Sequence, residues 1–139
     1  MLEAATSTNI QNLLYLAEFQ YGGRGRHGRV WYSPYGRNLS VSYGLETKLS
    51  QKSISCLSLV VGLAIADELT YLGLEGVELK WPNDIFISDK KLAGILIELT
   101  EKRDSRAIVI GLGLNLEITT EERLKIEQPI TDLKTLGVN

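Results

Sequence analysis

Two long apolar runs in the second half of the chain restrict its fold more than any other feature. Lys91–Leu99 and Ala107–Leu116 are separated only by the charged turn Glu101–Arg106. Read as strands, they form an antiparallel hairpin. These two strands belong to the mostly antiparallel sheet that the sequence predicts.

Strand parity separates two faces in the second run. Gly111, Gly113 and Asn115 share one face, and an unbroken series of Ile and Leu residues occupies the other. Alternate glycines leave a trough in a sheet surface, which indicates either a ligand site or a closely packed helix. Lys91 begins the first run, where a lysine is either an exposed edge residue or a group that holds a phosphate over the trough.

Further strands and turns follow from alternation and from turn residues. Leu39–Glu46 alternates apolar and polar side chains, as in a half-buried strand, and Ser33-Pro34-Tyr35-Gly36 before it is typical of a turn. Four shorter strands are expected, at Tyr15–Gln20, Val30–Ser33, Val77–Trp81 and Ile85–Ile87. The sequence thus predicts a mostly antiparallel, mixed sheet.

The clearest helix is Ile54–Leu72, which ends at Gly73. Its expected core face has helical spacing and comprises Leu57, Val60, Val61, Ala64, Ile65, Leu69 and Leu72. Cys56 is interpreted as a small buried apolar residue of the same pattern. With this helix as the main cover of the sheet, the fold class is α+β.

The two ends of the chain carry weaker helix signals. Ser7, Thr8 and Asn9 are residues that cap helix N-termini, ahead of Ile10. Thr119 and Glu122 have the spacing of a capping box, and Thr131–Leu136 reads as a helical piece that ends at Gly137.

Composition bounds the function. The 139 residues are 44% hydrophobic and 23% charged, as in one globular domain, and the net charge of −2 argues against a general nucleic-acid partner. Cys56 and His27 are the only cysteine and histidine, so neither a disulfide nor a Cys/His metal site is expected. No 18-residue apolar stretch or basic leader is present, which favours a cytoplasmic protein without a membrane partner.

A glycine- and arginine-rich segment, Gly22–Arg29, cannot form a core strand or a stable helix. Its glycines leave backbone N–H groups unshielded, and its arginines favour an anion, so we expect a loop that binds a phosphate or carboxylate. Lys80-Trp81-Pro82-Asn83-Asp84 adds an amide and a carboxylate at a strand break, although turns use Asn and Asp freely. No Ser/Cys–His nucleophile accompanies them, so these parts favour nucleotidyl or acyl-adenylate chemistry.

Five motifs, in order along the chain, resemble those of biotin–protein ligases. Residues 23–31 (GRGRHGRVW) resemble the GRGRxGRxW loop, residues 80–84 the KWPND motif and residues 91–96 the KLAGIL motif. Residues 111–115 resemble the GxGxN strand, and Ser7-Thr8-Asn9 the STN motif. The match covers nearly the whole chain.

The resemblance implies a class II synthetase-like fold and a two-step ligase reaction. Biotin and ATP, assisted by Mg²⁺, give biotinyl-5′-AMP and pyrophosphate, and a lysine of a biotin carrier domain then takes up the biotinyl group and releases AMP. The carrier domain of a biotin-dependent carboxylase would be the protein partner. No tightly bound cofactor is implied.

The resemblance also implies roles for individual residues. Lys91, Arg26 and Asp84 would be catalytic: Lys91 stabilises charge on the reacting carboxylate and phosphate, Arg26 retains the adenylate and Asp84 assists the acceptor amine. The biotin site would comprise Ser7, Thr8, Asn9, Gln20, Gly23, Arg24 and Lys91. The ATP site would comprise Arg26, Trp31, Asn83 and Asn115.

The chain departs from the family pattern in two places. The segment between Asn9 and Ala17 is shorter than usual, and the chain stops at Asn139, where family members continue into a small C-terminal β-barrel domain. We therefore expect residues 1–139 to form one catalytic domain, incomplete at its C-terminus, without that barrel and without an N-terminal DNA-binding domain.

Three other functions stay open from the sequence. A shortened homologue could bind biotin or its adenylate without transferring it, and a related lipoate–protein ligase would share the fold. An RNA-binding module built on Gly22–Arg29 is the third, but the acidic balance and the lack of interleaved aromatic residues argue against it.

Overall fold

A six-stranded antiparallel sheet forms the centre of the molecule. The computed structural model describes residues 12–50, 53–54, 56–101 and 106–138. The strand order is β1-β2-β6-β5-β4-β3. The strands are β1 (Leu13–Ala17), β2 (Asn38–Thr47), β3 (Val77–Lys80), β4 (Asp84–Ile87), β5 (Lys90–Glu101) and β6 (Arg106–Asn115). The expected hairpin is confirmed as β5 and β6, which lie in the middle of the sheet. The only parallel pairing in the described part of the chain is an isolated bridge between Lys91 and Ile130.

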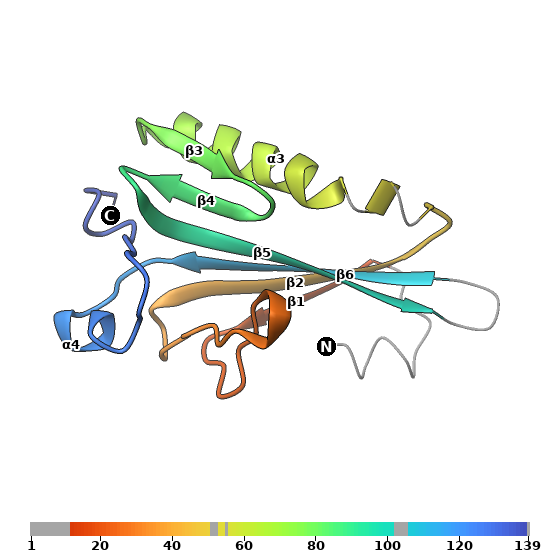
Figure 1. Cartoon of the computed structure of the whole chain (residues 1–139), viewed down its shortest axis with the longest axis horizontal. Coiled ribbons are helices and arrows are strands. Elements are labelled where there is room, and N and C mark those ends of the chain that lie inside the picture. The colour runs from red at the N-terminus through yellow and green to blue at the C-terminus, as the bar shows by residue number, and fades with distance from the viewer. Residues whose placement is uncertain (1–11, 51–52, 55, 102–105, 139) are drawn as a thin grey trace.

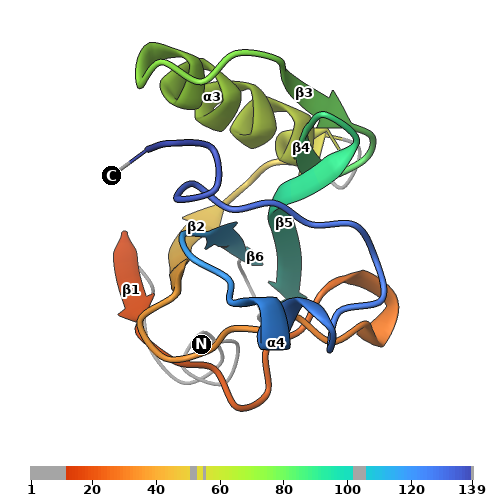
Figure 2. The same cartoon turned by 90° about the vertical axis from the view of Figure 1, so that its left-hand side faces the viewer.

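Helix and hairpin segments lie on opposite faces of this sheet. The long helix α3 (Leu57–Tyr71) covers the half formed by β3, β4 and β5. The segment of residues 20–33, with a single 3-10 turn η1 (Arg26–Gly28) at its tip, lies on the other side (Figures 1 and 2). The short helix α4 (Thr120–Arg123) follows β6. These layers confirm the α+β class. None of the described helices is long and apolar enough to span a membrane.

The hydrophobic core lies between α3 and the sheet. A Cβ placed on Gly62 would come within 3.2 Å of Leu79 Cδ2 and 3.5 Å of Ile95 Cδ1, so the helix rests closely on the strands at this point. The buried cluster comprises Leu69, Leu74, Ile85, Ile87, Leu92, Ala93, Ile95 and Leu114. Leu133, Leu136 and Val138, near the C-terminus, pack against the same cluster.

The predicted positions of the strands that flank the glycine-rich segment were wrong. The expected strand Tyr15–Gln20 lies at Leu13–Ala17, and Val30–Ser33 is not a strand. Instead the segment pairs with itself through isolated bridges, Gln20 with Ser33 and Arg24 with Val30. A short irregular hairpin of this kind has no alternating pattern that would reveal it.

The expected core face of the long helix was partly wrong. Val60 and Leu72 are 62% and 54% exposed, and Ala64 is exposed as well, because α3 packs through Gly62, Ala66 and Leu69. Apolar residues surround this helix, so spacing alone cannot select the inward face. Cys56, expected to be buried, is exposed because it precedes the first turn of α3.

The predicted chain ends had mixed outcomes. The capping box is confirmed: Glu122 N–H donates to Thr119 Oγ1 at 3.2 Å, and Thr119 N–H donates to Glu122 Oε2 at 2.8 Å. Thr131–Leu136 is not a helix but a series of turns, because Asp132 and Asn115 take up its backbone groups. The helix start at Ser7–Asn9 lies outside the described residues.

We expect Ile95→Ala to lower the free energy of unfolding by about 2–5 kcal/mol, because it opens a cavity in a well-packed core. Ile95 is 2% exposed and lies against α3. Urea denaturation measures the change. Leu63→Ala, on the 55% exposed outer side of α3, is the matched control and should cost no more than about 0.5 kcal/mol. Equal losses in the two variants would contradict the packing described above.

Candidate active site

The glycine- and arginine-rich segment forms a backbone-paired hairpin, called here the Gly/Arg hairpin (residues 20–33). Trp31 N–H donates to Gly23 O at 2.9 Å, and Gly25 N–H donates to Arg29 O at 2.7 Å. A Cβ on Gly23 would collide with the Trp31 carbonyl oxygen, so this crossing requires glycine. At the base, the Ser33 and Ser40 hydroxyls lie 3.0 Å apart and join the hairpin to β2.

The hairpin places Trp31 on a bare patch of the central strands. Gly94 of β5 and Gly113 of β6 are direct cross-strand partners. A Cβ on Gly113 would lie 2.6 Å from the indole Nε1, and one on Gly94 would lie 3.3 Å from the indole Cζ3. The predicted glycine trough is therefore occupied by the indole of Trp31. Gly111 lies farther along the same strand, and a Cβ there would meet Leu96 of β5 instead of the indole.

Lys91 and Asp84 lie beside this indole. Lys91 Nζ is 2.9 Å from Asp84 Oδ1 and 5.5 Å from the centre of the Trp31 ring. The lysine side chain is 12% exposed and the aspartate 23% exposed, so the ion pair is largely withdrawn from water. A carboxylate on one side and an aromatic face on the other attract the ammonium group and orient it. This cluster joins the ends of β4 and β5 to the hairpin.

Asn83 connects the tip of the hairpin to β5. Its side-chain N–H donates to Ile95 O at 2.7 Å, and its own backbone oxygen accepts from Ile95 N–H at 2.9 Å. Asn83 is therefore fixed, and its Oδ1 accepts a hydrogen bond from Arg26 at 3.5 Å. The strand break expected at Pro82–Asp84 is a turn at residues 81–83, with Asp84 already in β4, and this turn holds the Asn83 amide against the arginine-rich tip.

Asn115 lies at the buried end of β6. Its Oδ1 accepts from Asn38 Nδ2 at 3.3 Å, and its Nδ2 donates to Thr131 O at 3.0 Å and to Lys91 O at 3.5 Å. Asn38 also donates to Tyr32 O at 3.2 Å, which links the hairpin base to the same network. Asn115 therefore connects three segments around Lys91.

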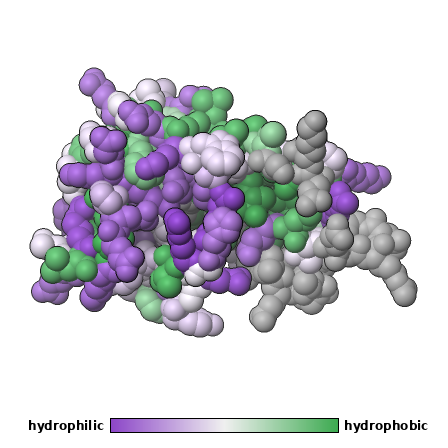
Figure 3. Space-filling model, viewed as in Figure 1, coloured by the Kyte–Doolittle hydropathy of each residue, from purple (hydrophilic) through white to green (hydrophobic). Residues whose placement is uncertain are grey.

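A cavity of about 280 Å³ lies between the hairpin tip and β5. Its lining comprises Arg24, Gly25, Arg26, His27, Gly28, Leu96 and Glu98. Arg24 Nη2 lies 3.9 Å from Glu98 Oε1 across it. Hydrophilic residues gather over the left and centre of the molecule in Figure 3, and Figure 1 shows the hairpin tip near the centre of the same view. The cavity is thus cationic on one wall, as an anionic ligand requires.

The structure brings most of the predicted site residues together. Lys91, Asp84 and Trp31 form one cluster, and Arg24 and Arg26 line the adjoining cavity. Gln20 lies at the base of the hairpin, where it pairs with Ser33, and its side-chain Oε1 would be 3.1 Å from a Cβ on Gly23. Ser7, Thr8 and Asn9 lie outside the described residues, so their predicted role in biotin binding stays a prediction.

Two residues of this region escaped the sequence reasoning. Glu98 shares a strand face with Gly94 and Leu96, so parity along β5 could have placed it beneath the hairpin. Asn38 begins β2 after a turn and resembles an ordinary turn residue, so nothing in its spacing signals a partner at Asn115.

Two groups away from Lys91, Tyr35 and Glu117, have shifted pKa values. Glu18 holds the pKa of Tyr35 above its ordinary value through a side-chain hydrogen bond and its negative charge. A hydrogen bond from Lys134 lowers the pKa of Glu117. Tyr35 is 72% exposed and the Glu117 side chain 45% exposed, so these shifts describe local surface pairing.

Comparison with known proteins agrees with this geometry. The sequence model of the biotin/lipoate A/B protein ligase family matches residues 4–115. The chain is 43% identical over 125 residues to the bifunctional ligase/repressor BirA of Escherichia coli, covering 89% of this chain and 39% of that protein. It is 35% identical over 142 residues to the biotin–[acetyl-CoA-carboxylase] ligase of Mycobacterium tuberculosis, covering 99% of this chain and 51% of that one.

Solved structures give the same result. The biotin protein ligase of Aquifex aeolicus in complex with biotin and ATP has a TM-score of 0.74 and 27% identity, covering 99% of this chain and 57% of that one. The Leishmania major enzyme in complex with biotinyl-5-AMP has a TM-score of 0.72 and 28% identity, over 99% and 59% of the two chains. The fold is therefore the class II synthetase-like fold of these ligases. The chain belongs to the biotin/lipoate A/B protein ligase family, and spans about two fifths of the length of the BirA proteins it resembles.

We expect Gly113→Ala to displace the Trp31 indole, because the added methyl would lie 2.6 Å from Nε1. The two tryptophans of the chain are Trp31 and the 77% exposed Trp81, so fluorescence in a Trp81→Phe background reports Trp31 alone. The emission should shift to the red as the indole moves into water. Gly111→Ala, whose Cβ would make an ordinary 3.4 Å contact with Leu96 O, is the control and should leave the spectrum unchanged. An unshifted Gly113→Ala spectrum would show that Trp31 does not rest on this glycine.

Proposed function

We propose that this chain carries the catalytic site of a biotin–protein ligase, which forms biotinyl-5′-AMP from biotin and ATP and then biotinylates a carrier lysine. The observation that carries the proposal is the Lys91–Asp84 pair beside Trp31, on a glycine floor beneath an arginine-rich hairpin. Family membership supports the reaction class. The relatives named biotin ligases are about twice as long or longer, so activity of this chain is part of the proposal.

In the first step, a biotin carboxylate oxygen forms a bond to the α-phosphorus of ATP while the bond to pyrophosphate breaks. Negative charge accumulates on the phosphoryl oxygens during this exchange. An ammonium group held at this position lowers the barrier because it is oriented before the charge develops. Lys91 fits this role, since Asp84 and the Trp31 ring orient its ammonium group and its 12% exposure limits screening by water.

The hairpin would bind both parts of the adenylate. Arg24, Gly23 and Gln20 are proposed to contact biotin, with Ser7, Thr8 and Asn9 completing that pocket. Arg26 is proposed to retain the phosphate, with Asn83, Trp31 and Asn115 on the nucleotide side. The 280 Å³ cavity between Arg24, Arg26 and β5 supports this division, because an acyl adenylate is anionic at its phosphate and the cavity has a cationic wall.

In the second step, the carrier lysine amine attacks the carbonyl carbon of the mixed anhydride. A C–N bond forms, the C–O bond to AMP breaks, and the amine loses a proton. Asp84 is proposed to accept that proton after Lys91 turns from it toward the ligand phosphate. Its 23% exposure and its place at the start of β4 support this role.

Mg²⁺ is proposed to arrive with ATP as part of the substrate, because Mg²⁺ in nucleotide sites is held largely by the phosphates. Among the described residues no group of three or more His, Cys, Asp or Glu side chains is placed to hold a metal. The protein partner is proposed to be the biotin carrier domain of a biotin-dependent carboxylase. A cytoplasmic location, where ATP is supplied, belongs to the same proposal.

The decisive experiment is a turnover assay with biotin, ATP, Mg²⁺ and a biotin carrier domain. Pyrophosphate release and biotinylation of the carrier support the proposal. Binding of biotinyl-AMP without transfer would select the inactive homologue instead. Preference for lipoate in direct competition with biotin would select a lipoate ligase.

Lys91→Ala should lower the rate constant of adenylate formation by about 10²–10³-fold, the loss typical of removing one preorganised charge-stabilising group. Pyrophosphate release measured at saturating biotin and ATP gives this constant. Lys90→Ala is the matched control, because Lys90 is the preceding residue in β5 and its side chain is exposed. Equal activity of the two variants would remove Lys91 from the mechanism.

A further inference from the structure

Lys91 lies where the central ladder of the sheet ends. The pairing of β5 with β6 begins at Ala93, opposite Leu114, and β6 ends at Asn115. The segment Pro129–Thr131 takes the vacated place: Lys91 N–H donates to Pro129 O at 3.0 Å, and Thr131 N–H donates to Lys91 O at 2.9 Å. The backbone of Lys91 is therefore held by a segment that belongs to no strand.

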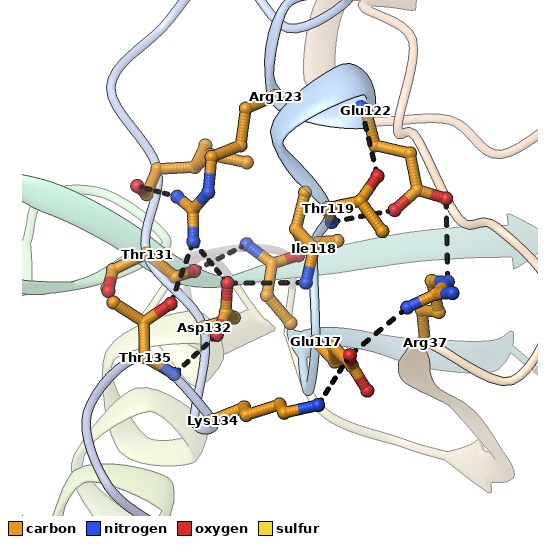
Figure 4. A network of polar contacts seen from close by, with 12 residues as sticks. Arg37, Glu117, Ile118, Thr119, Glu122, Arg123, Thr131, Asp132, Lys134 and Thr135 are labelled. Atoms are coloured by element: carbon orange, nitrogen blue, oxygen red, sulfur yellow. Dashed lines mark hydrogen bonds and ion pairs between the residues drawn. The ribbon is translucent and has the colours of Figure 1, made fainter.

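Arg123 of α4 holds this segment in place. Its Nη1 donates to Ile130 O at 2.8 Å, and its Nη2 donates to Thr135 Oγ1 at 3.0 Å. The same Nη2 forms an ion pair with Asp132 (Figure 4). One planar guanidinium thus binds the segment on both sides of Thr131, a geometry that lysine cannot reproduce.

Asp132 is the buried counterpart of this arginine. Its side chain is 1% exposed, its Oδ1 accepts from Thr135 N–H at 2.7 Å, and its Oδ2 accepts from Ile118 N–H at 3.2 Å and pairs with Arg123. Every oxygen of this carboxylate is therefore satisfied. A buried carboxylate of this kind depends on its cationic partner, because the charge alone would be costly to bury.

Asn115 completes the attachment from the side of the sheet. Its Nδ2 donates to Thr131 O at 3.0 Å, and its backbone oxygen accepts from Leu133 N–H at 3.1 Å. The segment from Ile130 to Leu133 is thus fixed at four consecutive residues, between the end of β6 and α4. Neither Arg123 nor Asp132 lines the cavity under the hairpin.

We propose that Arg123 and Asp132 are positioning residues: they fix Pro129–Thr131 against Lys91 and so set the place of its ammonium group for adenylate formation. The inference rests on the proposed role of Lys91. Loosening the segment breaks the two hydrogen bonds that Pro129 and Thr131 make with the Lys91 backbone. The Lys91 ammonium group then shifts from its position 2.9 Å from Asp84 Oδ1. Small displacements of a reacting group lower rates strongly.

The test compares Arg123→Met with a matched control in the same network. Lys134 lies in the turn that follows Asp132, and its Nζ lies 2.7 Å from Glu117 Oε1 at the surface. Lys134→Met removes this exposed ion pair. We expect Arg123→Met to lower the rate constant of adenylate formation about tenfold, with KM for biotin roughly unchanged, since positioning affects the reacting geometry. Lys134→Met should change neither quantity.

A double-mutant cycle with Lys91→Ala separates positioning from general destabilisation. If Arg123 acts through Lys91, Arg123→Met should cause no further loss in the Lys91→Ala background, whereas a merely structural effect would add to it. Arg123→Met with Asp132→Asn removes the unpaired buried charge and serves if the single variant does not fold. Additive losses would overturn the proposal.

Hydrogen exchange on the ligand-free protein tests, independently of turnover, whether Arg123 holds Pro129–Thr131 against Lys91. The amides of Lys91 and Thr131 should exchange about tenfold faster in the Arg123→Met protein, while those in α3 stay unchanged. Unchanged exchange at Lys91 would overturn the proposal even if turnover fell. A wild-type chain without turnover contradicts the proposed function instead, and the exchange result still decides whether Arg123 holds Lys91.

Discussion

The cross-strand pair of Gly94 and Gly113 is the contact on which the functional face depends. Side chains at these positions would occupy the space of the Trp31 indole. Because these positions carry no side chain, the indole lies directly against the sheet and holds the Gly/Arg hairpin there. The centre of the Trp31 ring then lies 5.5 Å from Lys91 Nζ. The two glycines thus determine where the arginines of the hairpin lie relative to Lys91.

Strands inside the sheet could be read from the sequence because their signal is local. Leu39–Glu46, Ile85–Ile87 and the β5–β6 pair alternate or remain apolar along their length, and each is a strand of the structure. The hairpin flanks and Thr131–Leu136 were misjudged for the opposite reason. Their conformations depend on individual pairings that no periodic pattern signals, Trp31 with Gly23 in one case and Asp132 with Arg123 in the other.

The same distinction applies to the site. Lys91, Asp84 and Trp31 were predicted through motifs, and strand parity placed Gly113 on the face that carries them. Arg123 and Asp132 belong to no motif, because an ion pair between a short helix and a turn has no characteristic spacing. Glu98 lies between these cases: it was missed, although parity along β5 would have found it.

The sheet therefore divides its two faces between different physical tasks. Toward α3 it presents Ile95 and its buried apolar neighbours, whose packing supplies most of the stability. Toward the hairpin it presents glycines, a cation and a carboxylate, which contribute little apolar burial. A polar face of this kind stays ordered only if its backbone is fixed elsewhere. Hydrogen bonds fix the backbone at both ends of the site: the Asn83 side chain bonds to the Ile95 backbone, and the Thr131 backbone bonds to the Lys91 backbone.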